Sequence, residues 1–139
     1  MIEELAAFID AHTSLIYGTN LFIGHLPKKT AAGTVPPARH VIILENNPGA
    51  LDFYVPDSGQ YEYQFLCESN TYLTARADAY EIFRFLHGTA GWELPIITSG
   101  EFYRINSAAA VAPPASVTNP SEAGTFAFSV NFILNISRD

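Results

Sequence analysis

The chain has 139 residues, which is enough for one domain whose core needs no disulfide or metal to hold it. Its net charge of −7, with only seven Lys and Arg residues, argues against a protein that grips nucleic acid, because that binding needs cations to neutralise phosphates. We therefore expect a single domain over residues 1–139 that does not bind DNA tightly.

The first stretch, residues 2–15, has the apolar spacing of an amphipathic helix. Ile2, Leu5, Ala6 and Ile9 recur at helical intervals, and the acidic residues of the stretch lie off that stripe. The segment has neither a basic start nor an uninterrupted apolar run, so it does not read as a signal peptide. No segment of the chain approaches the roughly 20 apolar residues of a membrane span, so we expect no membrane partner.

Three strands are predicted next, at residues 20–27, 40–46 and 60–69. The second is continuously apolar and β-branched, which favours a strand in the middle of the sheet with both faces covered. The third alternates aromatic and polar side chains and is typical of a half-buried strand. Between them, residues 47–59 contain two prolines and two glycines and read as a long excursion with a brief extended piece at 53–55.

The strongest helix signal lies between a cap at Asn70 or Thr71 and a stop at Gly88. Its buried stripe is formed by apolar side chains at helical spacing, namely Tyr72, Ala75, Ala79, Ile82, Phe83 and Leu86. The charged residues of this segment lie off the stripe, so one face of the helix is predicted to pack on a sheet.

Two more strands complete the chain, at residues 101–107 and 124–137, joined by a Pro-rich loop. The last is about twice the usual strand length of 5–6 residues and alternates strictly. One face is apolar, and the other is small and polar and includes Asn131 and Asn135. A strand this long needs partners, and the strand at 101–107 is the expected one.

The predicted order is helix, strand, strand, strand, helix, strand, strand. This order predicts an α+β fold in which a mostly antiparallel sheet of about five strands packs against two helices. No repeat of 20 to 50 residues and no run of like charge interrupts it.

No grouping of residues has the spacing of a catalytic or metal site. The four histidines, His12, His25, His40 and His87, stand at ends of predicted elements and read as structural or solvated. Cys67 shares a strand face with tyrosine and phenylalanine and is expected to be a small core residue. Glycine-rich phosphate loops are absent. We therefore predict a protein that is not an enzyme and takes no cofactor and no metal.

Two loop aromatics, Phe53 and Tyr54, are framed by prolines and a glycine. A loop that faces solvent gains nothing from two large rings unless something covers them, which favours an interface with a partner. The alternative, equally weighted, is that both rings tuck under their own loop.

Several segments together resemble the tail terminator family of long-tailed bacteriophages, often labelled minor capsid proteins. They are "IEELAAFIDAH…YGTNLFIGHLP", "HVIILENNPG", "YEYQFLCES…TARADAYEIFRFLHG", "FYRINS" and "FAFSVNFIL". The resemblance spans nearly the whole chain. It implies a small α+β virion protein with no catalytic residues to carry over.

The resemblance also implies partners. It points to a ring of identical subunits, with six as the expected number, on the head-proximal end of the tail tube. Such a ring ends tube polymerisation, contacts the tail tube protein and the head–tail connector proteins, and lets DNA pass through its lumen without specific binding. The expected location is the virion tail or neck, and the host cytoplasm during assembly. Candidate interface residues are Phe53, Tyr54, Asp57, Asn131 and Asn135.

Two other functions remain open. Another neck or head-completion subunit shares nearly all of these features. From a different class, a small-ligand-binding or enzymatic α+β domain could use the aromatic-rich sheet to line a pocket.

Overall fold

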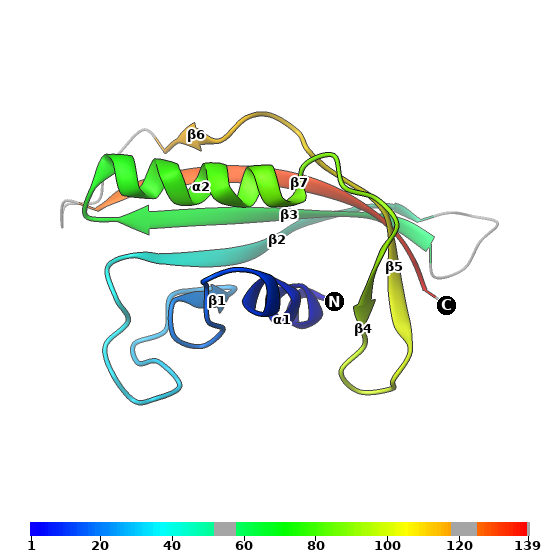
Figure 1. Ribbon diagram of the computed structural model, residues 1–139, viewed down its shortest axis with the longest axis horizontal. Coiled ribbons are helices and arrows are strands. Elements are labelled where there is room, and N and C mark those ends of the chain that lie inside the picture. The colour runs from blue at the N-terminus through cyan, green and yellow to red at the C-terminus, as the bar shows by residue number, and fades with distance from the viewer. Residues whose placement is uncertain (52–57, 118–124, 139) are drawn as a thin grey trace.

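The computed structural model describes residues 1–51, 58–117 and 125–138, which form two helices and a seven-stranded sheet (Figure 1). In chain order the elements are α1 (Ile2–His12), β1 (Leu21–Ile23), β2 (His40–Leu51), β3 (Ser58–Ser69), α2 (Tyr72–Leu86), β4 (Trp92–Pro95), β5 (Phe102–Ala110), β6 (Ala115–Ser116) and β7 (Phe126–Arg138). The α+β class and the two helices predicted from the sequence are confirmed.

Both helices bury most of the stripe that their spacing predicts, but Tyr72, at the start of the second predicted stripe, is 44% exposed and Phe83 is half-buried. In α1 the buried apolar residues are Leu5, Ala6 and Ile9, and in α2 they are Ala75, Ala79, Ile82 and Leu86. The first helix ends at His12, three residues earlier than predicted, because Thr13 is extended and its hydroxyl donates to the Ile9 carbonyl over 2.7 Å. A threonine bonded in this way offers the backbone an alternative to another helical turn.

The sheet is built around the long strands β3 and β7, which are antiparallel and paired along the whole of β3, from Ser58 opposite Ser137 to Ser69 opposite Phe126. The alternating pattern of each strand puts its aromatic side chains and most of its aliphatic ones on one face, with Leu66 and Ile133 on the other. Phe65 and Phe132 meet edge to face there, with ring centroids 5.6 Å apart, and neither is exposed. On its other side β7 pairs with β5, as predicted, and also with β6.

The sheet has seven strands where about five were predicted, in the order β1-β2-β3-β7-β5-β4, with β6 pairing β7. It is mixed, because β1 pairs with β2 in parallel, while the other pairs are antiparallel. The sequence missed β4 and β6. The first is four residues long and ends in Pro95, and the second is two residues long. Short, proline-containing strands at a sheet edge give almost no pattern to read.

Two strands also run further than predicted. β2 continues past Asn46 to Leu51 through Pro48, and its register with β3 shifts on both sides of that proline. Such shifts let a strand accommodate a residue that cannot donate to the ladder. β5 continues to Ala110 through a run of alanines, of which Ala108 is buried. Alanine carries little strand signal, so the extension follows from pairing with β7 and not from propensity.

Both helices pack on the same face of this sheet. α2 lies along β3 and β7 (Figure 1), and α1 contacts β1, β2 and β4. Within the described residues no helix covers the opposite face, which we call the open face. β2 is central, between β1 and β3, but helices cover only one of its faces, so Leu44 remains half-buried. The predicted central position of β2 is confirmed, and the predicted cover on both faces holds at Ile42, which is 6% exposed, but not at Leu44.

Candidate functional site

The open face carries the two strand residues that the sequence singled out. Asn131 and Asn135 lie on β7 opposite Gln64 and Gln60 of β3 and are half-buried. The Asn135 side-chain amide donates to the Ser107 hydroxyl over 2.7 Å. The predicted alternation thus placed both asparagines correctly on one face, and β5 supplies the partner of the second.

A second amide contact crosses the same face. The Asn46 side chain donates to Asn131 Oδ1 at 3.5 Å and to Glu62 Oε1 at 3.4 Å, both long hydrogen bonds. Among the described residues the NH₂ group of Asn131 has no acceptor. The open face therefore presents an amide donor of Asn131, with the Glu62 carboxylate close by on the same face. Phe53, Tyr54 and Asp57, the other candidate interface residues, lie outside the described residues.

A buried ion pair ties the first residue of β2 to the end of β3. His40 is 3% exposed, its Nε2 lies 3.0 Å from Glu68 Oε2, and its Nδ1 lies 2.8 Å from the Pro37 carbonyl oxygen. Both neighbours are acceptors, so both contacts are satisfied when the imidazole is protonated and both ring nitrogens donate. Burial lowers the pKa of His40, but the hydrogen bonds to Glu68 and Pro37 outweigh it and hold that pKa above its ordinary value.

The preceding residue makes a second long-range pair. Arg39 donates from Nε to Asp78 Oδ2 at 2.9 Å and from Nη2 to Asp78 Oδ1 at 2.6 Å, which is a bidentate pair between the start of β2 and α2. The aspartate is buried although the sequence placed it off the apolar stripe, because the arginine, itself 62% exposed, covers it.

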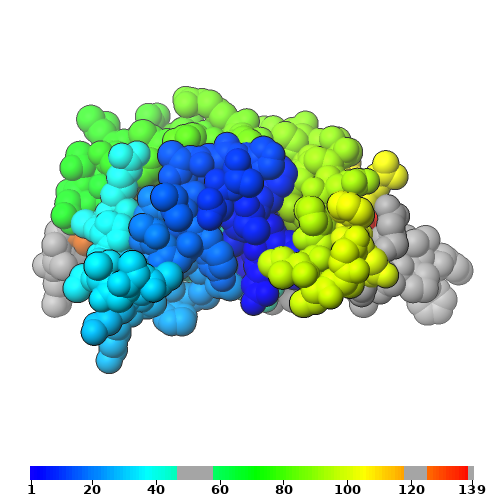
Figure 2. All heavy atoms as spheres, turned by 60° about the horizontal axis from the view of Figure 1, so that its bottom comes forward, coloured from blue at the N-terminus to red at the C-terminus, as the bar shows by residue number. Residues whose placement is uncertain are grey.

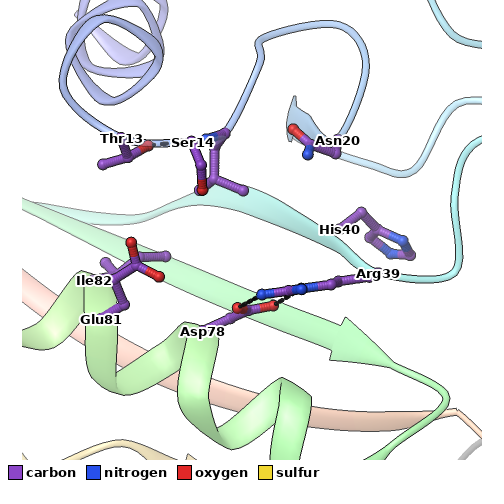
Figure 3. A pocket seen from close by; sticks show the side chains of 9 residues that line it. Thr13, Ser14, Asn20, Arg39, His40, Asp78, Glu81 and Ile82 are labelled. Carbon is purple, nitrogen blue, oxygen red and sulfur yellow. Dashed lines mark hydrogen bonds and ion pairs between the residues drawn. The ribbon is translucent and has the colours of Figure 1, made fainter.

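These residues border a pocket of about 280 Å³ between the end of α1, the start of β2 and α2 (Figure 3). Its rim is polar and includes Thr13, Ser14 and Asn20. Two of its charged groups are bonded to each other, since the guanidinium of Arg39 donates to both carboxylate oxygens of Asp78, and Glu81 adds an exposed carboxylate to the lining. No group of three potential metal ligands occurs in the described part of the chain.

The remaining candidate side chains have structural uses. Cys67 is completely buried between strands, and burial raises the pKa of its thiol, which makes it a poor nucleophile. His12 donates to the Phe8 carbonyl, and His87 accepts the Ala110 N–H over 2.9 Å. Sequence analysis did not predict the pairs made by Arg39 and His40, because their partners lie 39 and 28 residues further along the chain. Among the described residues no helix is long and apolar enough to cross a membrane.

The fold is that of a small α+β protein in which two helices cover one face of a mixed sheet, while the other face carries both polar and apolar side chains. A family model described as "Bacteriophage tail terminator protein" matches residues 8–138. Because this match covers nearly the whole chain, the chain belongs to the bacteriophage tail terminator proteins, and it is a structural protein of the virion tail. The resemblance found in the sequence is confirmed. A search of curated proteins found no match.

Proposed function

We propose that this protein forms a ring on the head-proximal end of the tail tube, where it ends tube polymerisation and joins the tail to the head connector. The observation that carries this proposal is the family match over residues 8–138. A structural family also favours a role without catalysis.

The surface that folding leaves uncovered supports a subunit with neighbours. Large apolar side chains that remain exposed include Ile16, Val35, Leu73 and Ile97. These side chains lie on separate segments, and single exposed apolar groups are normal at a protein surface, so the low share of charged residues, 15%, is the stronger support for a surface with neighbours. Copies of the chain and components of the tail are the partners that a ring supplies.

The open face suits contact with an adjoining subunit. Asn131 and Asn135 retain hydrogen-bonding groups there, and amides form interface hydrogen bonds without the desolvation cost of charges. We propose these two residues as interface residues, together with Phe53, Tyr54 and Asp57. Six subunits is the number that we expect.

The charge distribution suits a lumen through which DNA passes. With a net charge of −7, a ring of such subunits repels the phosphate backbone more than it attracts it. DNA would then slide past the subunits without being held at any position.

A tube-growth assay tests the proposal. The tail tube protein of the same virus is polymerised with and without this chain, and tube lengths are measured by electron microscopy. We expect the chain to shorten the tubes at substoichiometric amounts by capping an end. Tubes of unchanged length would contradict termination. If the chain bound preformed tail ends without arresting growth, a neck or head-completion role would replace it.

A further inference from the structure

Charge is divided unevenly along this acidic chain. Residues 11–44 contain two lysines, Lys28 and Lys29, one arginine, Arg39, and no Asp or Glu, whereas the whole chain has fourteen acidic residues. Arg39 is paired with Asp78, so the two lysines are the cations that this segment leaves to solvent. A cationic segment on an otherwise acidic subunit is attracted to the acidic parts of another copy.

Beside the two lysines lies an apolar groove of about 410 Å³. It runs along β1, an edge strand of the sheet, and is lined mainly by Tyr17, Phe22, Ile23, Pro27 and Ala31. Lys28 directly follows Pro27 of this lining. Leu26, also next to Pro27, is 42% exposed. The groove is therefore an apolar depression with cations at its border.

The opposite edge of the sheet ends in a protruding hairpin turn between β4 and β5. The turn is closed by a hydrogen bond from the Ile96 N–H to the Glu101 carbonyl over 2.8 Å, and Gly100 supplies the positive φ of 71° that it needs. Ile96 is 6% exposed and anchors the turn, whereas the next residue, Ile97, is 63% exposed. The turn thus holds an isoleucine out into solvent.

Acidic residues flank this projecting isoleucine. Glu93 on β4 and Glu101, which directly precedes β5, are both exposed, and Arg104 on β5 lies opposite Glu93, so this hairpin carries two acidic residues and one cation. In Figure 2 the α1 helix lies between the hairpin, in yellow, and the segment that follows β1, in blue to cyan, so the two surfaces are separated on the molecule. One subunit therefore cannot bring them together by itself, but two adjacent subunits can.

We propose that the hairpin turn of one copy docks in the groove of the next, with Ile97 in the groove and Glu93 facing Lys28 and Lys29. This inference rests on the proposed ring and names the surfaces that build it. Two different patches meet in such a contact, so each subunit keeps one free hairpin and one free groove until the ring closes. The partner is a second copy, because charge and apolar character on the two patches are complementary.

Single substitutions test each patch, and each has a matched control. Ile97→Asp puts a charge where the groove needs an apolar group, and Val111→Asp is its control because Val111 is 60% exposed and lies outside the hairpin. Ala31→Glu places a carboxylate in the groove, and Ala32→Glu places the same group on the next residue, also exposed but outside the lining. We expect the two patch variants to weaken self-association at least about tenfold and the controls to leave it unchanged.

A mixing experiment distinguishes this contact from a symmetric one. Ile97→Asp retains its groove and Ala31→Glu retains its hairpin, so an equimolar mixture should give a heterodimer by native mass spectrometry although neither variant associates alone. Circular dichroism and thermal melting of each variant show that it is folded. A mixture that stays monomeric while the wild type assembles would overturn the inference.

The remaining outcomes separate the inference from the proposed function. Wild-type rings that persist in both patch variants would overturn this contact and leave the tail terminator role intact. Wild-type protein that arrests tube growth as single copies would overturn the ring and this contact together. Failure to arrest growth, with self-association that depends on Ile97 and Ala31, would support the contact and contradict termination.

Discussion

His40 and Glu68 face each other at the first rung of the β2–β3 ladder and join their side chains over 3.0 Å. The His40 side chain is buried, and its Nδ1 donates to the Pro37 carbonyl oxygen. The imidazole thereby fixes the end of the loop that precedes β2 to the end of β3.

This pair makes stability depend on pH. The pKa of His40 is raised in the folded protein, so its contribution is fully present below the ordinary value of 6.5 and is lost as pH rises through the folded pKa. We expect the free energy of unfolding to fall over that interval, as measured by urea denaturation at a series of pH values. Glu68→Gln keeps an acceptor but removes the charge, so it should flatten the dependence. His25→Gln, at an exposed site, is the control, and an unchanged slope in Glu68→Gln would contradict the assignment.

The pair between Arg39 and Asp78 predicts an asymmetry between its two halves. Arg39→Ala leaves a buried carboxylate without its partner and should cost on the order of 2 kcal/mol of unfolding free energy. Asp78→Ala releases an arginine that is already 62% exposed, so it should cost about 1 kcal/mol or less. Chemical denaturation of both variants and of the double variant measures the difference. Equal costs would show that the carboxylate finds another partner.

Neighbouring residues of β7 should differ sharply in their effect on stability. Phe132 is completely buried against Phe65, so Phe132→Ala should lower the free energy of unfolding by about 3–5 kcal/mol. Ile133 points to the open face and is half-buried, so Ile133→Ala should cost about 1 kcal/mol. Both are measured by urea denaturation of dilute protein. A large cost at Ile133 would mean that the open face is covered.

The asparagines of the open face predict a change in assembly without a change in fold. Asn131→Arg adds a bulky cation to the proposed subunit contact, so it should weaken ring formation in light scattering. The melting temperature of the dilute protein should stay close to that of the wild type, because the side chain is only half-buried. Thr19→Arg, at an exposed position on the loop before β1, serves as the control. Unimpaired assembly of Asn131→Arg would remove this residue from the interface.

The periodicity of apolar residues predicted most of the helices and strands, and it failed for the elements that are too short to show a period. The alternation in β3 and β7 and the stripes of α1 and α2 are repeated signals of burial, so the sequence predicts which face of each element meets the core. β4 and β6 offer two to four residues each, too few for a period, and they exist because longer neighbours present edges to pair with.

The candidate site could be predicted only where it depends on the alternation of polar and apolar residues along a strand. That rule places Asn131 and Asn135 on one face, but it does not reveal that Ser107 and Asn46 reach them from β5 and β2. The ion pairs of Arg39 and His40 depend on contacts made by folding across many residues. The groove beside β1 forms where the loops on both sides of this short edge strand come together, and no local sequence pattern predicts that arrangement.

The most direct test of the central claim is electron cryomicroscopy of tail tubes grown in the presence of this chain. We predict a closed ring of identical subunits at one tube end only, with the tube stopped beneath it. Copies scattered along the tube, or tube ends that carry no density for the chain, would contradict the account.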